Sequence, residues 1–191
     1  MIQAVLDADV IYPLPLRDTL LSAAVEGCFR PLWSEQILDE AIRNLVADRR
    51  MTEASAARMH AALMANFEDS WVEGYEHRIA GMPNHPKDRH VAACAAEGGA
   101  GLIVTSNLKD FADLPEGVKA VSPDEFLCDL MVEHPDRMRA ALVAQSARLK
   151  KEPLSVAQIL GLLAPVTPGF VAVFKAVHPD LADSASDAGN G

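Results

Sequence analysis

The chain has 191 residues, half of them hydrophobic, and a formal net charge of −10 at pH 7. This length and apolar fraction suit one globular core with an appendage, and no apolar stretch approaches the ~20 residues of a membrane-spanning helix. The negative charge argues against a protein that coats nucleic acid by general attraction, because phosphate would repel it. It does not exclude a nuclease, because bound metal ions offset part of the acidity.

Strands and helices alternate over the first two thirds of the chain. In chain order, apolar runs predict strands at 2–6, 30–33, 70–73, 102–106 and 118–122, and Pro31 marks 30–33 as an edge strand. Helical spacing and N-cap residues predict helices over 16–26, 35–49, 52–66 and 87–98. A further helix should follow the capping box of Ser122 and Glu125. This alternation is typical of an α/β fold with an open parallel sheet flanked by helices.

After about residue 130 only helical patterns remain. They cover 135–150, 155–164 and 168–177, and the second begins with the capping box of Ser155 and Gln158. The polar segment that follows predicts a disordered tail. We therefore expect an α/β domain over 1–128, a small all-helical extension over 129–178 and a disordered tail over 179–191.

The start of the chain and its cysteines predict a cytoplasmic protein. No basic region precedes an apolar segment at the N-terminus, so we expect no signal peptide. Cys28, Cys94 and Cys128 lie far apart and form neither a disulfide framework nor a CxxC metal clip. A reducing compartment is therefore expected.

Oxygen-bearing side chains from four segments are expected at one edge of the sheet, beyond the carboxyl ends of its strands. They are Asp7 and Asp9 after the first strand, Glu40 in the helix 35–49, Asp88 at the start of the helix 87–98, and Thr105, Asn107 and Asp110 around the end of the strand 102–106. Clustered carboxylates repel one another unless a cation neutralises them, and such oxygen ligands suit Mg²⁺ or Mn²⁺. The pattern predicts a metal site that orients and activates water against a phosphodiester.

Four stretches in series resemble the PIN-domain family, and within it the bacterial VapC-type toxin ribonucleases. They are "VLDADVIY", "ILDEAIRNL", "HPKDRHVAACAAEGGAGLIVTSNLKDF" and "VSPDEFL", and the resemblance covers about residues 1–128. It implies a PIN-like parallel sheet flanked by helices and a carboxylate cluster that binds Mg²⁺ or Mn²⁺ for RNA hydrolysis. It also implies an RNA substrate, a cognate antitoxin protein as partner, and homodimerisation. Residues 130–178 resemble the helical extension of longer members.

The resemblance is carried over residue by residue. Asp9 stands where the family often has Asn, which adds charge at the mouth of the site. The position of the fourth acid is Asn107 here, with Asp110 three residues later, so either one would supply the fourth ligand. The other family positions are matched by Asp7, Glu40 and Asp88 as the first three acids and by Thr105 as the hydroxyl.

Two other functions compete with the ribonuclease. "LDADV" also resembles the strand end of haloacid-dehalogenase-like phosphatases, with Asp7 as nucleophile and Asp9 as acid. That chemistry needs a separate lysine and a later strand ending in paired acids, and it leaves Glu40 and Asp88 without roles. Alternatively, Asp9 and Asn107 would mark a degenerate, non-catalytic PIN domain that acts as a binding module.

Charged residues around Asp88 have simpler interpretations. His85 and His90 are five residues apart, with no cysteine or third histidine nearby, so we expect no zinc site. Lys87, Arg89 and Lys109 surround the expected mouth, where they would either contact phosphate or form a solvated rim.

Overall fold

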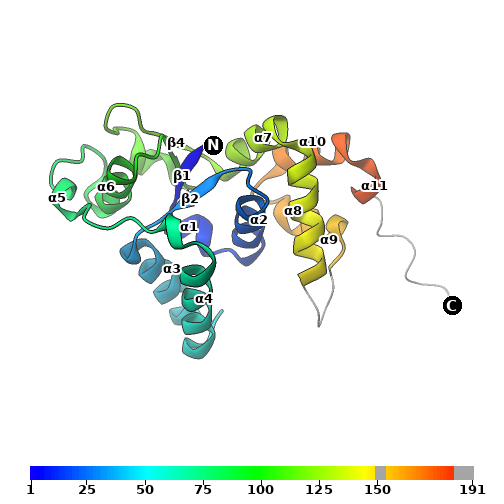
Figure 1. Ribbon diagram of the computed structural model, residues 1–191, viewed down its shortest axis with the longest axis horizontal. Coiled ribbons are helices and arrows are strands. Elements are labelled where there is room, and N and C mark those ends of the chain that lie inside the picture. The colour runs from blue at the N-terminus through cyan, green and yellow to red at the C-terminus, as the bar shows by residue number, and fades with distance from the viewer. Residues whose placement is uncertain (149–153, 183–191) are drawn as a thin grey trace. The chain divides into compact units, whose positions relative to one another are not determined.

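A parallel four-stranded sheet organises the first part of the chain (Figure 1). The computed structural model describes residues 1–148 and 154–182. The strands β1 (Gln3–Leu6), β2 (Arg30–Leu32), β3 (Leu102–Val104) and β4 (Lys119–Val121) lie in the order β2-β1-β3-β4, and each neighbouring pair is parallel. The predicted open parallel α/β sheet is therefore confirmed.

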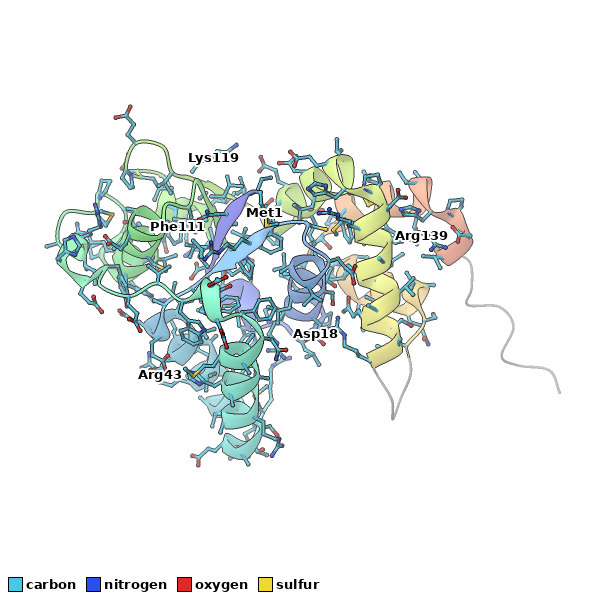
Figure 2. All side chains as sticks on the ribbon, in the orientation of Figure 1. Met1, Asp18, Arg43, Phe111, Lys119 and Arg139 are labelled. Carbon is cyan, nitrogen blue, oxygen red and sulfur yellow. The ribbon has the colours of Figure 1, made fainter. Side chains whose placement is uncertain are left out.

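The two central strands, β1 and β3, are fully buried at their middle positions. Val5 lies in register with Ile103, and both side chains are inaccessible to solvent. This burial explains why the two strands read as continuous apolar runs rather than as alternating patterns. At the edge of the sheet, Lys119 of β4 is exposed, whereas Phe111 in the preceding segment is buried (Figure 2).

Helices connect the strands of the sheet along the chain. They are α1 (Ala8–Ile11), α2 (Leu14–Val25), α3 (Glu35–Ala47), α4 (Glu53–Asn66), α5 (Glu76–Ile79) and α6 (Arg89–Gly98), with the short 3-10 helices η1 (Glu68–Ser70), η2 (Pro86–Asp88) and η3 (Leu108–Phe111). Helix α6 packs against β1 and β3, and α3 contacts α1, α4 and α6 (Figure 1). The caps predicted at Ser34 and Thr52 are confirmed, because their side chains accept N–H groups in the first turns of α3 and α4.

Several predicted boundaries were wrong. The strand expected at 70–73 is only an isolated bridge between Trp33 and Trp71, where the two indole rings meet edge to face. The helix expected from 87 begins as η2, and α6 starts at Arg89. The strand expected over 102–106 ends at Val104. The chain also forms the short helix α1 directly after β1. This helix was not predicted, because its residues continue the apolar run of the strand.

The described chain forms two compact units. The first contains residues 1–13 and 30–122, and the second contains residues 14–29 with the chain from 123 onward. Helix α2 thus belongs with the C-terminal helices, although it precedes β2 in sequence. The domain boundary expected at residue 128 falls inside α7 (Pro123–Glu133). The two compact units therefore differ from the predicted division into residues 1–128 and 129–178.

Among the residues that the structure describes, the regular elements of the second unit are all helices. Besides α2 and α7 they are α8 (Pro135–Arg148), α9 (Val156–Leu163), α10 (Pro168–Val177) and α11 (Pro179–Ala182). The capping box of Ser155 and Gln158 is confirmed, as is the helix 168–177. Residues 149 and 150 of the helix predicted over 135–150 lie outside the described residues.

The first four residues of the predicted tail are helical. Residues 179–182 form α11, and Nη2 of Arg139 on α8 lies 2.7 Å from Oδ2 of Asp180 (Figure 2). The rest of the predicted tail, 183–191, lies outside the described residues. Among the helices that the structure describes, none combines the length and the apolar character needed to span a bilayer.

Candidate active site

Asp7 lies where β1 turns into α1. Its backbone N–H donates to the carbonyl of Val104, and its Oδ1 accepts the N–H of Ala8 at 2.7 Å, so the side chain caps α1. Its Oδ2 accepts the hydroxyl of Thr105 at 2.8 Å, and the residue is only 7% exposed. The acid that follows the buried strand is therefore held in place at both carboxylate oxygens.

Thr105 connects the two acids after β1. Its fully buried hydroxyl lies 2.8 Å from Oδ2 of Asp7 and 3.2 Å from Oδ2 of Asp9, and it accepts the N–H of Asn107. Asp9 also accepts the N–H of Ser106, at 3.0 Å. Because a hydroxyl carries one proton, Thr105 can donate to only one of the two carboxylates at a time.

The carboxylates disturb one another's ionisation. Burial raises the pKa of Asp7 to about 7, and the neighbouring charge of Asp9 raises it too, against the hydrogen bonds from Thr105 and Ala8. Burial likewise raises the pKa values of Asp9 and Asp88. These shifts are expected of acids held together without a neutralising cation.

Asp88 and Glu40 reach the same region from two other elements. Asp88 ends η2, is 7% exposed, and has a buried Oδ2 with no hydrogen-bond partner. Glu40 of α3 places its Oε2 3.6 Å from Nε2 of His90, a buried histidine of α6. The other ring nitrogen of His90 lies 3.2 Å from the carbonyl of Lys87, which can only accept, so this nitrogen carries the proton. In the neutral ring Nε2 then faces Glu40 with a lone pair.

A cavity of about 400 Å³ collects five of the seven predicted site residues. They are Asp7, Asp9, Glu40, Asp88 and Asn107. Lys87 also lines the cavity, as expected of a residue at the mouth, whereas Arg89 donates to the carbonyl of Asn84 in the neighbouring loop. A larger groove, of about 600 Å³ between α3 and α4, contains none of the predicted site residues.

Thr105 and Asp110 do not line this cavity. Thr105 is fully buried, with its hydroxyl next to Asp7 and Asp9. Asp110 lies in η3, where its Oδ2 accepts the side-chain N–H of Asn107. The carbonyl of Asp110 also accepts the backbone N–H of His85 at 3.1 Å. One ligand atom from each of His85, Asp88 and Asp110 lies within 4.8 Å of the other two. Asp88 therefore adjoins both the cavity and this second group of side chains.

Two features of the site escaped sequence reasoning. Tyr12 lines the cavity and its hydroxyl donates to Oδ2 of Asp48 at 2.6 Å, across 36 residues of sequence. The approach of Asp110 to His85 spans a similarly long stretch of chain. His85 and Asp88 are three residues apart, which the sequence shows directly. The sequence around them gave no indication that Asp110 lies beside them.

The donor set fits a hard divalent cation. Carboxylate and amide oxygens converge from separate elements, burial and the neighbouring Asp9 raise the pKa of Asp7, and a buried oxygen of Asp88 has no partner. A cation would relieve the repulsion and satisfy that oxygen.

Residues 3–109, more than half of the chain, match the family model described as PIN domain. The chain belongs to the PIN-domain family. The C-terminal part of this PIN-domain protein, residues 123–176, matches the model described as VapC50 C-terminal domain. The resemblance seen in the sequence is therefore confirmed for both parts.

A relative of this PIN-domain protein from Mycobacterium tuberculosis (strain ATCC 25618 / H37Rv) bears the name "Putative ribonuclease VapC50". The two sequences are 36% identical over 109 residues, which cover 56% of this chain. They cover 64% of the relative, so the chain spans less than two thirds of that protein's length. No solved structure matches the chain.

Proposed function

We propose that this protein is a metal-dependent endoribonuclease of the VapC-like toxin type, which hydrolyses RNA phosphodiesters. The observation that carries the proposal is the cavity in which Asp7, Glu40 and Asp88 converge from the end of β1, from α3 and from the end of η2. Family membership and the name of the mycobacterial relative support it.

Asp7, Glu40 and Asp88 would hold Mg²⁺ or Mn²⁺, with Asp9 beside them and with Asp110 or Asn107 as a further ligand. The bound ion would neutralise the acids and make water a nucleophile that attacks the phosphodiester in line, without a covalent enzyme intermediate. Thr105 fixes the direction of the Asp7 carboxylate through its hydrogen bond. Lys87 brings a positive charge to the same cavity, where a substrate phosphate would lie.

The proposal of a VapC-like toxin includes its partners and its compartment. We propose that the protein binds a cognate antitoxin protein, forms a homodimer and is located in the cytoplasm. The proposal also displaces the haloacid-dehalogenase-like phosphatase, because the chain belongs to a different family. The non-catalytic PIN module stays as the competing proposal, motivated by Asn107 and by the extra charge of Asp9.

The deciding experiment is cleavage of a pool of structured RNAs by the purified protein in Mg²⁺, Mn²⁺ or EDTA. Wild type should cleave only with metal, and Asp88→Asn should lower the rate at least about 100-fold, since it weakens the binding of the ion that activates water. Glu116→Gln, on an exposed loop, is the matched control and should cleave like wild type. Binding of Mn²⁺ without cleavage of any RNA would favour the binding module, and full activity of Asp88→Asn would contradict the assigned site.

A further inference from the structure

We propose that Tyr12 binds a nucleobase of the RNA by stacking against it inside the active-site cavity, beside the acids that would hold the metal ion. The inference rests on the proposed ribonuclease and adds to it a contact with the RNA away from the cleaved phosphodiester. Tyr12, Asn44 and Asp48 line the same cavity as Asp7, and all of them belong to the first compact unit.

Helix α1 places Tyr12 next to the acids that follow β1. Asp9 lies in the first turn of α1, and Tyr12 is the C-cap of the same helix, three residues later. Side chains three residues apart lie on one face of a helix, and both of these line the cavity. The aromatic ring therefore adjoins the expected metal ligands.

A row of α3 side chains leads from the acids to the ring. Glu40, Asn44 and Asp48 are spaced by four residues, so they form one stripe, and each of them lines the cavity. The stripe runs about 12 Å along the helix axis. It ends at Asp48, the C-cap of α3, whose Oδ2 accepts the hydroxyl of Tyr12 at 2.6 Å. The cavity thus extends from the expected metal ligand Glu40 to an aromatic side chain.

The ring of Tyr12 is held in place before any RNA arrives. Its hydroxyl donates to Asp48, and the guanidinium carbon of Arg50 lies 5.5 Å from the ring centroid. This separation is typical of a cation–π contact. Tyr12 is nevertheless partly exposed, because it lines the cavity. A ring that is already fixed loses little conformational freedom on binding, which favours affinity.

An uncommon backbone turn brings Arg50 to the ring. Helix α3 ends in a Schellman motif, in which the N–H of Arg49 donates to the carbonyl of Val46 at 3.0 Å. The N–H of Arg50 donates to the carbonyl of Leu45 at 2.9 Å. Arg49 has a φ of 56°, in the left-handed region where glycine is usual. Such strained positions concentrate at functional sites, which supports a positioning role for Arg50.

The chemistry at this end of the cavity favours a base over a phosphate. Carboxylates of five residues line the cavity, together with Lys87, and the chain has a net charge of −10. Further phosphates would be repelled there, whereas stacking on an aromatic ring does not depend on charge and accepts every base. The amide of Asn44 can both donate to and accept from the edge of a base.

The test measures how variants of the full-length protein bind a fluorescein-labelled, single-stranded RNA of random sequence, about 12 nucleotides long, by fluorescence anisotropy in Mg²⁺. All variants carry Asp88→Asn, which prevents rapid cleavage. Tyr12→Leu should raise the Kd about tenfold, as the loss of a stacked base does, whereas Tyr12→Phe keeps the ring and should stay within about threefold of the parent. Met64→Ala, at an exposed apolar side chain of α4, is the control and should bind like the parent.

Two further readouts separate contact with RNA from a structural role. Ultraviolet crosslinking of the same RNA carrying 4-thiouridine, followed by mass spectrometry, should give a crosslinked peptide that contains Tyr12. With Asp88 intact, Tyr12→Leu should raise the KM for a cleaved RNA about tenfold and lower kcat less, because stacking contributes to binding of the substrate itself.

Three outcomes would overturn the inference. They are RNA binding by Tyr12→Leu as tight as in the parent, crosslinks that leave out the Tyr12 peptide, and equal losses of affinity in Tyr12→Leu, Tyr12→Phe and Asp48→Asn. The last result would mean that Tyr12 only joins α1 to α3 through its hydrogen bond.

Failure of the ribonuclease would look different. RNA that is bound in a Tyr12-dependent way, and that the protein with Asp88 intact does not cleave, would overturn only the proposed ribonuclease. Cleavage with unchanged KM and kcat in Tyr12→Leu would overturn only the nucleobase contact. Binding of no RNA by any of the proteins would overturn both.

Discussion

The hydroxyl of Thr105 lies between Asp7 and Asp9, two acids whose charges repel each other. It lies within hydrogen-bonding distance of both Asp7 and Asp9, and the N–H of Asn107 donates to it in turn. Because Asp7 also caps α1, its carboxylate cannot turn away to relieve the repulsion. Burial is the main cause of the raised pKa values of Asp7 and Asp9, and neighbouring carboxylates raise them further.

Asp7→Asn should stabilise the metal-free protein. Since the folded-state pKa of Asp7 is about 7 and its ordinary value is 3.8, the native state loses stability as the pH rises from about 4 to about 7 and loses no more above that range. In EDTA at pH 8 the variant should therefore be more stable, by on the order of 4 kcal/mol at most, and the gain should vanish near pH 4. Thermal unfolding followed by circular dichroism across this pH range measures the difference.

Saturating Mn²⁺ should reverse the order of the two proteins, because only the wild-type carboxylate gains the binding free energy. Glu116→Gln serves as the control, since its exposed side chain makes no part of the cluster. A variant less stable than wild type in EDTA at pH 8 would mean that Asp7 acts mainly as a structural hydrogen-bond acceptor.

At the scale of elements, a helix in the second unit is capped by a neighbouring helix. Both oxygens of Asp124 on α7 accept N–H groups from the first turn of α10, those of Gly169 at 3.0 Å and Phe170 at 2.8 Å. A carboxylate at a helix N-terminus satisfies free donors and complements the helix dipole. A Cβ on Gly169 would lie 2.9 Å from an oxygen of Asp124, so glycine at this position allows the close approach.

Asp124→Ala should lower the free energy of unfolding by about 1–2 kcal/mol, the usual cost of a lost cap. Gly169→Ala should also destabilise wild type, because it displaces the carboxylate, but should be neutral or stabilising in the Asp124→Ala background. Urea unfolding of the four proteins and hydrogen exchange of the α10 amides test this cycle. Asp129→Ala, at an exposed acid on the same helix, is the control, and additive effects would disprove the coupling.

At the scale of the whole molecule, α2 is separated in sequence from the helices on which it packs. Leu16, Leu20 and Ala23 are buried, and the hydroxyl of Thr19 donates to Oε1 of Gln145 on α8 at 2.9 Å. Rings of Phe29 and Phe126 meet edge to face, with centroids 4.9 Å apart. The second unit is therefore completed by a segment that precedes most of the first unit along the chain.

A fragment of residues 1–122 should consequently fail to order α2. Its leucines would lose their cover, and each contributes about 1.5–3 kcal/mol when buried. We expect fast hydrogen exchange over 14–29 in the fragment, slow exchange in the full chain, and recovery when residues 123–191 are co-expressed. Slow exchange over 14–29 in the fragment alone would show that α2 does not need the C-terminal helices.

Features that depend on neighbouring residues could be predicted from the amino-acid sequence. The caps at Ser34, Thr52 and Ser155 are formed by hydrogen bonds that span three residues, and the apolar runs of β1 and β3 report their own burial. Asp7 and Asp88 could be predicted to lie near one another because strand ends and helix starts are locally encoded, and a parallel sheet brings such positions to one edge. Glu40 lies inside α3, and its place in the predicted site came from the family resemblance.

Contacts between residues far apart along the chain could be seen only in the folded structure. It placed α2 with the C-terminal helices, Tyr12 against Asp48, and Asp110 beside His85. Nothing in the local pattern around these residues indicates their partners, because each contact depends on the path of the whole chain between them. The end of β3 differs from its predicted position for the same reason. The strand was expected to reach residue 106, but pairing with β1 and β4 ends at Val104, because backbone pairing rather than apolar character sets the end of a strand.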